Sequence, residues 1–292
     1  MPEGDTLFRI AAGLRPYLAG RRIVAAAARS PGPRAELLEG TTVESVEARG
    51  KHLLIRFDSG LVLRTHLGMH GSWHRYAPGE RWRRPPSRAR IVLETETAVA
   101  VCFDAPTVEL FEARAESIHP ALSALGPDLM AADFDEQTLS EALRRLRDPV
   151  RAPLTIAEAL LDQHAMAGVG NVYKSEVLFV ERVNPFARVS ELGDETLRRL
   201  ILSSRRLLLA NSEGGARVTT DSGSGERRVA GRLWVYDRAG RPCRRCGVAI
   251  RSRSHGELDR VTYWCSRCQP EVEPAPEVEP LVEDRAMEIR DE

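Results

Sequence analysis

The sequence predicts an α+β protein of several domains, in which a helix and a β-sandwich precede a helical domain and a small cysteine-rich module. Short apolar runs separated by turn residues predict the sandwich. Apolar residues three and four positions apart predict the helical domain, and four of the five cysteines lie within 26 residues of one another. The expected domains are residues 1–125, 126–225 and 231–270, followed by a tail in residues 271–292.

The first predicted element is a helix that Asp5 or Thr6 caps and that Gly20 ends. Its apolar positions recur at helical spacing: Leu7, Ile10, Leu14 and Leu18. From Ile23 to about Phe111 the pattern changes to strands, in the runs RRIVAAAA, TVESVEA, HLLIRF, LVLRTHL, ARIVLET and AVAVCFD. A meander of this kind indicates a β-sandwich or barrel.

Helical periodicity returns in the second half of the chain. The segments are TLSEALRRLRD, LTIAEALLDQHAM, NVYKSEVLFVER and DETLRRLILSSRRLLLA. The Gly- and Ser-rich stretch SEGGARVTTDSGSGERR then separates this half from the cysteine module, which begins near Gly231.

The formal net charge of zero hides an uneven distribution of charge. Residues 271–292 carry nine acidic and two basic residues with Pro-Glu-Val repetition, which predicts a disordered acidic tail and leaves +7 on the rest. A basic body favours a polyanionic partner, although a solvated surface explains the charge equally well. Because no membrane span or leader pattern is present, we expect a cytoplasmic protein without a membrane partner. We also expect a monomer.

The cysteine module has the spacing of a metal site. Two CxxC pairs are separated by eighteen residues and consist of Cys243, Cys246, Cys265 and Cys268. Four thiolates at this spacing suit a tetrahedral zinc ion, and the residues between the pairs are long enough for a β-hairpin. Disulfides are the alternative, which a reducing cytoplasm disfavours. We therefore expect one structural zinc ion, with Cys102 buried in the core instead.

The predicted hairpin is rich in arginine. Seven arginines lie between Arg241 and Cys268, including Arg251, Arg253 and Arg260. Because guanidinium groups pair with phosphate oxygens, the hairpin is a candidate for binding a nucleic-acid backbone. A purely structural zinc ribbon with a solvated basic surface is the alternative.

A glycine-containing turn joins two of the predicted helices. Gly168 and Gly170 allow a sharp turn and the close approach of another chain, and Asn171 begins the next helix, whose free amides attract an anion. Turns of this type are frequent without a ligand, but the arginine-rich hairpin favours a phosphate here.

Taken together, these stretches resemble the formamidopyrimidine-DNA glycosylase and endonuclease VIII family of base-excision repair enzymes. The similar segments are MPEGDT, RGKHLLIRF, THLGMHGSW, LLDQHAMAGVGNVYKSEVLF and the finger with DRVTYWC. They occur in the family's order and extend from Pro2 to Cys268. The MPEGDT start is more similar to the endonuclease VIII branch. The resemblance implies a helix-two-turn-helix domain and damaged DNA, double- or single-stranded, as the partner of a nucleoid-associated enzyme.

The resemblance also implies a mechanism. Once Met1 is removed, the secondary amine of Pro2, with a pKa of about 8 as for other terminal amines, attacks the sugar carbon C1′. Loss of the base leaves a Schiff base, and β,δ-elimination then cuts the strand. Glu3 resembles the family's general acid and base. Lys51 resembles the lysine that contacts a phosphate near the lesion, and Asn171 and Arg260 resemble the residues that hold the flanking phosphates, Arg260 also assisting the second elimination.

Two departures from the family pattern concern substrate choice. FDAPTVELF lacks the arginine and phenylalanine that fill the gap opposite the extruded base in the formamidopyrimidine branch, so Leu67, Met69 and His70 are the candidates for this wedge. The segment before Leu233 also lacks the aromatic residues expected of a base-capping loop. The first departure supports the endonuclease VIII branch, and the second favours pyrimidine or single-stranded substrates.

Three alternatives remain open. The chain is either a bifunctional glycosylase and lyase, a non-catalytic zinc-dependent DNA-binding protein on the same scaffold, or an enzyme specific for 8-oxoguanine and formamidopyrimidines. A zinc-stabilised interaction module is a weaker alternative, because it does not explain the basic finger.

Overall fold

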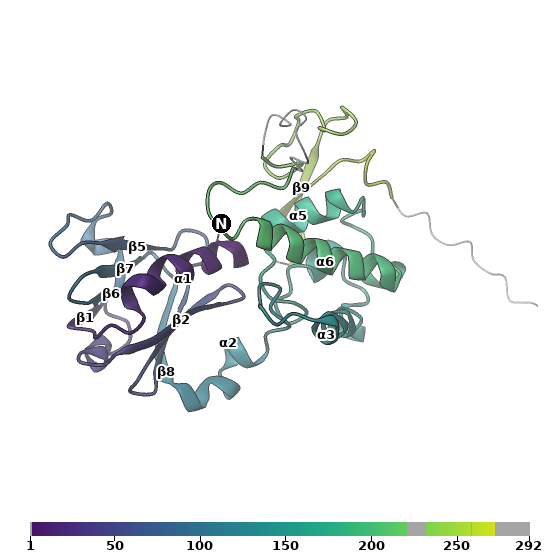
Figure 1. Ribbon diagram of the computed structural model, residues 1–292. Coiled ribbons are helices and arrows are strands. Elements are labelled where there is room, and N and C mark those ends of the chain that lie inside the picture. The colour runs from purple at the N-terminus through teal and green to yellow at the C-terminus, as the bar shows by residue number, and fades with distance from the viewer. Residues whose placement is uncertain (1, 221–231, 258, 272–292) are drawn as a thin grey trace, which may run out of the picture.

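The computed structural model describes residues 2–220, 232–257 and 259–271. Residues 272–292, for which an acidic disordered tail is predicted, lie outside the described residues. Residues 221–231, part of the segment compared with a base-capping loop, also lie outside them. Figure 1 shows the sandwich and the helices side by side, with the finger next to α5 and the N-terminus at the junction between α1 and α6. Within the described part of the chain, no helix is long and apolar enough to cross a membrane.

The first domain contains α1 (Gly4–Leu18) and two antiparallel sheets, which confirms the predicted helix and sandwich. One sheet has the order β1 (Ala25–Ala28), β6 (Ala89–Glu94), β7 (Val99–Phe103) and β5 (Ser72–Tyr76). The other has the order β2 (Val43–Arg49), β3 (His52–Phe57), β4 (Leu61–His66) and β8 (Thr107–Glu112). Apolar residues of α1 and of both sheets form one buried cluster.

The predicted cap of α1 is wrong. The helix begins at Gly4 with Glu3 as the capping residue, and no side chain caps its amides. The reason is that the nearby carboxylates bind elsewhere: Glu3 accepts hydrogen bonds from the helical domain, and Asp5 pairs with Arg217. The start of α1 is therefore tied to other parts of the chain.

The helical domain begins at residue 120. Its α-helices are α2 (Pro120–Ser123), α3 (Glu136–Leu146), α4 (Ile156–Ala159), α5 (Asn171–Val180) and α6 (Asp194–Ala210). Short 3-10 helices occur at Ala35–Leu38, Pro86–Arg88, Ala113–Ile118, Pro149–Arg151 and Val189–Glu191. Helices α3, α5 and α6 pack around a core of their own.

The predicted helix over LTIAEALLDQHAM is much shorter than expected, since α4 ends at Ala159. The side chain of Gln163 explains the difference. Its amide nitrogen donates to the carbonyls of Leu161 and Val169, and its oxygen accepts from the Gly168 amide at 3.0 Å. These bonds replace the helical ladder and fix a buried turn that leads into α5.

The finger is a two-stranded hairpin of β9 (Arg251–His255) and β10 (Arg260–Trp264), as predicted. Its end contacts the helical domain: His255 Nε2 lies 2.8 Å from Thr155 Oγ1 and 3.4 Å from Glu158 Oε2. The hairpin is thereby held against α4 and α5.

Candidate active site

The side chain of Glu3 lies at the N-terminus of α5. Its carboxylate accepts hydrogen bonds from the backbone amides of Gly170 at 2.9 Å, Val172 at 2.8 Å and Tyr173 at 3.3 Å. Amides at a helix start are free to donate and carry a partial positive charge, so they suit a carboxylate. Glu3 is fully buried, whereas the preceding Pro2 is half-buried.

The two predicted glycines allow this approach. A Cβ atom on Gly170 would lie 2.4 Å from the Glu3 Cδ atom. Gly168 has a φ of 110°, which favours glycine, and its carbonyl accepts from the Gly4 amide at 2.9 Å. The turn therefore holds the N-terminal segment of the chain, and its predicted contact with a phosphate stays a prediction.

Helix α5 also holds the finger. Asn171 Nδ2 donates to the Val261 carbonyl at 2.9 Å, and Lys174 Nζ donates to Thr262 Oγ1 at 2.8 Å. Lys174 is 1% exposed, and burial lowers its pKa to about 8, against the opposing charge of Glu3. The first turns of one helix thus contact both the N-terminal segment and β10.

Lys51 lies in the turn between β2 and β3. Asp128 fixes this turn by accepting from the Gly50 amide at 2.7 Å. Burial lowers the pKa of Lys51 to about 8; the charge of Glu3 opposes the shift and that of Arg260 adds to it. The charges of Glu3 and Arg260 thus both act on Lys51, although the three residues come from three segments of the chain.

Arg260 connects the finger with the first domain. Its Nη1 lies 3.6 Å from the sulfur of Met69, a residue 191 positions earlier. Met69 is 54% exposed and His70 is exposed, so both remain wedge candidates. Leu67, also predicted as a wedge candidate, is not available for this role. It is 1% exposed and packs in the sandwich core, because β4, which precedes it, directs its side chain inward.

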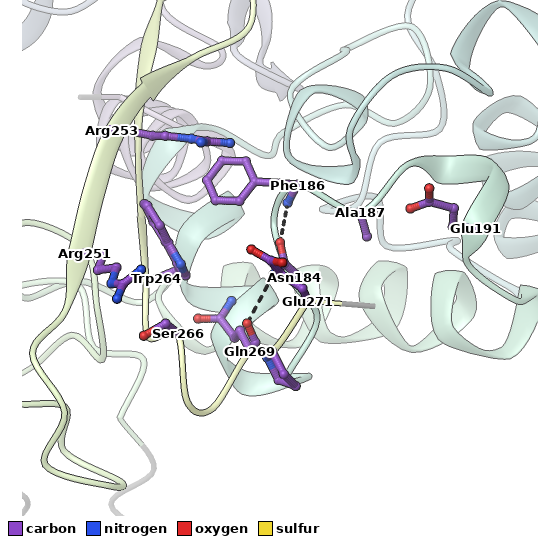
Figure 2. A pocket seen from close by; sticks show the side chains of 11 residues that line it. Asn184, Phe186, Ala187, Glu191, Arg251, Arg253, Trp264, Ser266, Gln269 and Glu271 are labelled. Carbon is purple, nitrogen blue, oxygen red and sulfur yellow. Dashed lines mark hydrogen bonds between the residues drawn. The ribbon is translucent and has the colours of Figure 1, made fainter. Parts of the chain in front are cut away.

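Arg253 lies in a different place. Figure 2 shows its guanidinium above the ring of Phe186, with the carbon Cζ 3.6 Å from the ring centroid, beside Trp264. These rings line a crevice between β9 and the loop after α5. The structure therefore gives Arg253 a stacking partner within the chain, and its predicted contact with DNA stays a prediction.

The four predicted cysteine ligands come together. Their sulfur atoms all lie within 4.8 Å of one another, with 3.9 Å between Cys243 and Cys268 and 3.4 Å between Cys246 and Cys265. A tetrahedral site with metal-sulfur bonds of about 2.3 Å has sulfur atoms about 3.8 Å apart. All five cysteines are free thiols, and Cys102 is fully buried in the sandwich. The cluster is suited to hold one metal ion.

Sequence reasoning missed several charged residues of the site. Arg217 pairs with Asp5 and approaches Glu3, and Glu176 binds the amides of residues 234–236. Lys174 and Glu176 stand in an otherwise apolar helix, which is a usable signal for buried charge with a specific partner. No local pattern identifies Arg217, because Asp5, with which it pairs, lies 212 positions earlier in the chain.

Comparisons with known proteins agree with this arrangement. Residues 1–107 match the formamidopyrimidine-DNA glycosylase N-terminal domain, and residues 125–222 match the H2TH domain of the same enzymes. The chain is 40% identical to a probable endonuclease 8 2 of Streptomyces coelicolor, over 94% of this chain and 96% of that protein.

Two further relatives complete the comparison. A Mycolicibacterium smegmatis protein named DNA-(apurinic or apyrimidinic site) lyase Nei2 is 40% identical over 92% of this chain and 99% of its own length. The crystal structure of MutM (Fpg) from Thermus thermophilus superposes with a TM-score of 0.76 at 29% identity, covering 93% of this chain and all of that one. The chain therefore belongs to the formamidopyrimidine-DNA glycosylase and endonuclease VIII family.

Proposed function

We propose that the chain is a bifunctional DNA glycosylase and lyase that excises oxidised bases, pyrimidines in preference, and cuts the strand by β,δ-elimination. The observation that carries the proposal lies next to Pro2 in the chain: Glu3 is fully buried, and the charges of Glu3 and Arg260 both act on Lys51, so three segments contribute to one cluster. A binding protein has no need for this convergence at a terminal secondary amine.

The proposed reaction starts when the neutral Pro2 amine attacks C1′ of an extruded nucleotide and the base leaves with its bonding electrons. The C1′–O4′ bond then breaks as the ring opens, and C1′ becomes part of an iminium. Removal of the C2′ proton sends the C2′–H electrons toward the iminium, and the 3′ phosphate leaves with the electrons of the C3′–O bond. Glu3 protonates the ring oxygen and moves protons during ring opening. Arg260 supports the second elimination, which releases the 5′ phosphate.

DNA is the proposed partner because the cationic side chains at the site converge from two domains. Lys51 comes from the sandwich and Arg260 from the finger, and the charge of Arg260 acts on Lys51. We infer that both bind phosphates next to the lesion. We further propose that the metal of the finger is zinc, since four thiolates at near-tetrahedral separation are its preferred structural ligands. The enzyme would then act on the chromosome in the cytoplasm.

Borohydride trapping tests the function. Protein with Pro2 as its first residue is incubated with duplex and single-stranded DNA that contains thymine glycol, 5-hydroxyuracil, 8-oxoguanine or an abasic site. We expect a covalent adduct that peptide mapping assigns to Pro2, and faster excision of the two pyrimidines. Protein that keeps residues ahead of Pro2 is the matched control, and it should bind DNA without cutting.

Three results would count against the proposal. Binding without incision would favour the non-catalytic protein. Incision without an adduct at Pro2 would refute the mechanism, and a clear preference for 8-oxoguanine would refute the pyrimidine specificity.

A further inference from the structure

Arg217 follows α6 in the chain but contacts two carboxylates at the start of α1. Its Nε donates to Asp5 Oδ2 at 2.9 Å and its Nη2 to Asp5 Oδ1 at 2.6 Å. Its Nη1 lies 3.9 Å from Glu3 Oε1. The side chains of both carboxylates are fully buried, and that of Arg217 is 14% exposed. One guanidinium therefore neutralises two buried anions next to Pro2.

The two carboxylates depend on their partners to different degrees. Glu3 has three backbone amides at α5, whereas the two-point partner of Asp5 is Arg217. Asp5 also contacts Thr6 Oγ1 at 3.2 Å and Arg9 Nη2 at 3.6 Å, both on the same helix, and it interacts with the side chain of Tyr173 on α5. Since a buried charge without a partner is costly, loss of Arg217 would force the first turn of α1 to move toward water.

Tyr173 completes the arrangement. Its ring lies under the Arg217 guanidinium, with Cζ 4.9 Å from the centroid, while its backbone amide donates to Glu3 Oε2. Two residues beyond Arg217, Thr219 donates its hydroxyl to the buried carboxylate of Glu176 on the same helix. Helix α5 therefore contacts both the Arg217 side chain, through Tyr173, and the segment just after it, through Glu176.

We propose that Arg217 is a positioning residue, which holds the first turn of α1 against α5 so that the Pro2 amine and the Glu3 carboxylate keep a fixed relation. The inference rests on the proposed function. Arg217 acts through Asp5 and Glu3 and not on the substrate itself. A shift of about 1 Å at a reacting group is enough to slow a reaction about 100-fold.

The test compares Arg217→Gln, Arg217→Lys and Arg217→Ala with the unchanged chain. The readouts are the single-turnover trapping rate on a saturating abasic-site duplex and the Kd for that DNA. We expect Arg217→Gln to lower the trapping rate by about 100-fold with an unchanged Kd. Arg217→Lys should recover part of the rate, and millimolar guanidinium chloride should restore part of it in Arg217→Ala.

Arg147→Gln is the matched control. It removes a 2.6 Å ion pair with Asp194, the first residue of α6, and bonds to the Val189 and Leu192 carbonyls, whereas Arg217 follows the other end of that helix. A second readout is hydrogen exchange at the Gly4 amide, which donates to the Gly168 carbonyl. It should accelerate in Arg217→Gln and stay unchanged in Arg147→Gln. Asp5→Asn, which keeps the shape of the side chain, should resemble Arg217→Gln.

Four results would overturn the inference: wild-type trapping in Arg217→Gln, an equal loss in Arg147→Gln, a change in Kd alone, or unchanged exchange at Gly4. If the unchanged chain itself forms no adduct, the proposed function fails, and exchange at Gly4 still decides whether Arg217 holds the terminus.

Discussion

The carboxylate of Glu3 and the backbone amide of Gly170 lie 2.9 Å apart, although 167 positions separate the two residues in sequence. The contact leaves no room for a side chain at position 170, where a Cβ atom would lie within 2.4–2.8 Å of three Glu3 atoms.

We expect Gly170→Ala to reduce Schiff-base trapping by about 100-fold, because the methyl group would push the Glu3 carboxylate off the α5 amides. The measurement is single-turnover trapping on an abasic-site duplex. Gly193→Ala is the control: this glycine also precedes a helix, α6, and a Cβ there meets nothing within 4 Å. Equal trapping by both variants would contradict the predicted role of this close approach.

The pH dependence of cleavage should have a narrow maximum near pH 8. The Pro2 amine, with a pKa of about 8, must lose its proton to attack, so the rate rises with pH. Lys51, whose pKa burial lowers to about 8, loses its charge over the same range, so its contribution to kcat/KM falls with pH.

Lys51→Arg separates these two limbs. Arginine stays charged up to a pH of about 12, so the falling limb should move to higher pH while the rising limb stays. The pH profile of kcat/KM on a damaged duplex measures this. If the falling limb is unchanged in the variant, Lys51 is not the group that titrates.

Met69 and Leu67 should behave differently when each is changed to alanine. Met69→Ala should leave the melting temperature unchanged but slow excision from duplex DNA more than from single strands, because an exposed wedge matters only where a gap must be filled. Leu67→Ala should lower the free energy of unfolding by about 2–5 kcal/mol, since it leaves a cavity in the core. Normal duplex excision by Met69→Ala would exclude Met69 as the wedge.

Removal of the metal should weaken the contribution of the finger to DNA binding. Cys268→Ser is expected to lose the bound metal and to weaken DNA binding at least about tenfold, as Arg260 is no longer held next to Met69. Elemental analysis and DNA binding at several salt concentrations measure the two effects. Cys102→Ala is the control and should keep one metal per chain; loss of metal from this variant would contradict the assignment of the ligands.

Residues with local patterns could be predicted from the sequence, and residues with distant partners could not. A short apolar run between turn residues identified β3, and the period of 3.6 identified α6, because each pattern lies within one element. The CxxC spacing identified all four members of the metal cluster for the same reason.

The errors have a common physical cause. The cap of α1 and the length of α4 were mispredicted because side chains of Glu3 and Gln163 bind groups outside their own segments. The resemblance to known enzymes identified Glu3 and Lys51, but it gave no indication of Lys174 or Arg217, whose partners become neighbours only in the folded chain.

The contacts of α5 determine when in the life of the chain this site can exist. Glu3 is synthesised long before residues 170–173, which hold it, and the helix that holds it is itself packed against Val261 and Thr262. Contacts of such long sequence separation require the closure of long loops, which slows folding. The ribosome must therefore add about 260 residues before all partners of Glu3 and α5 are present, so the buried surroundings of Glu3 are a product of the late stages of synthesis.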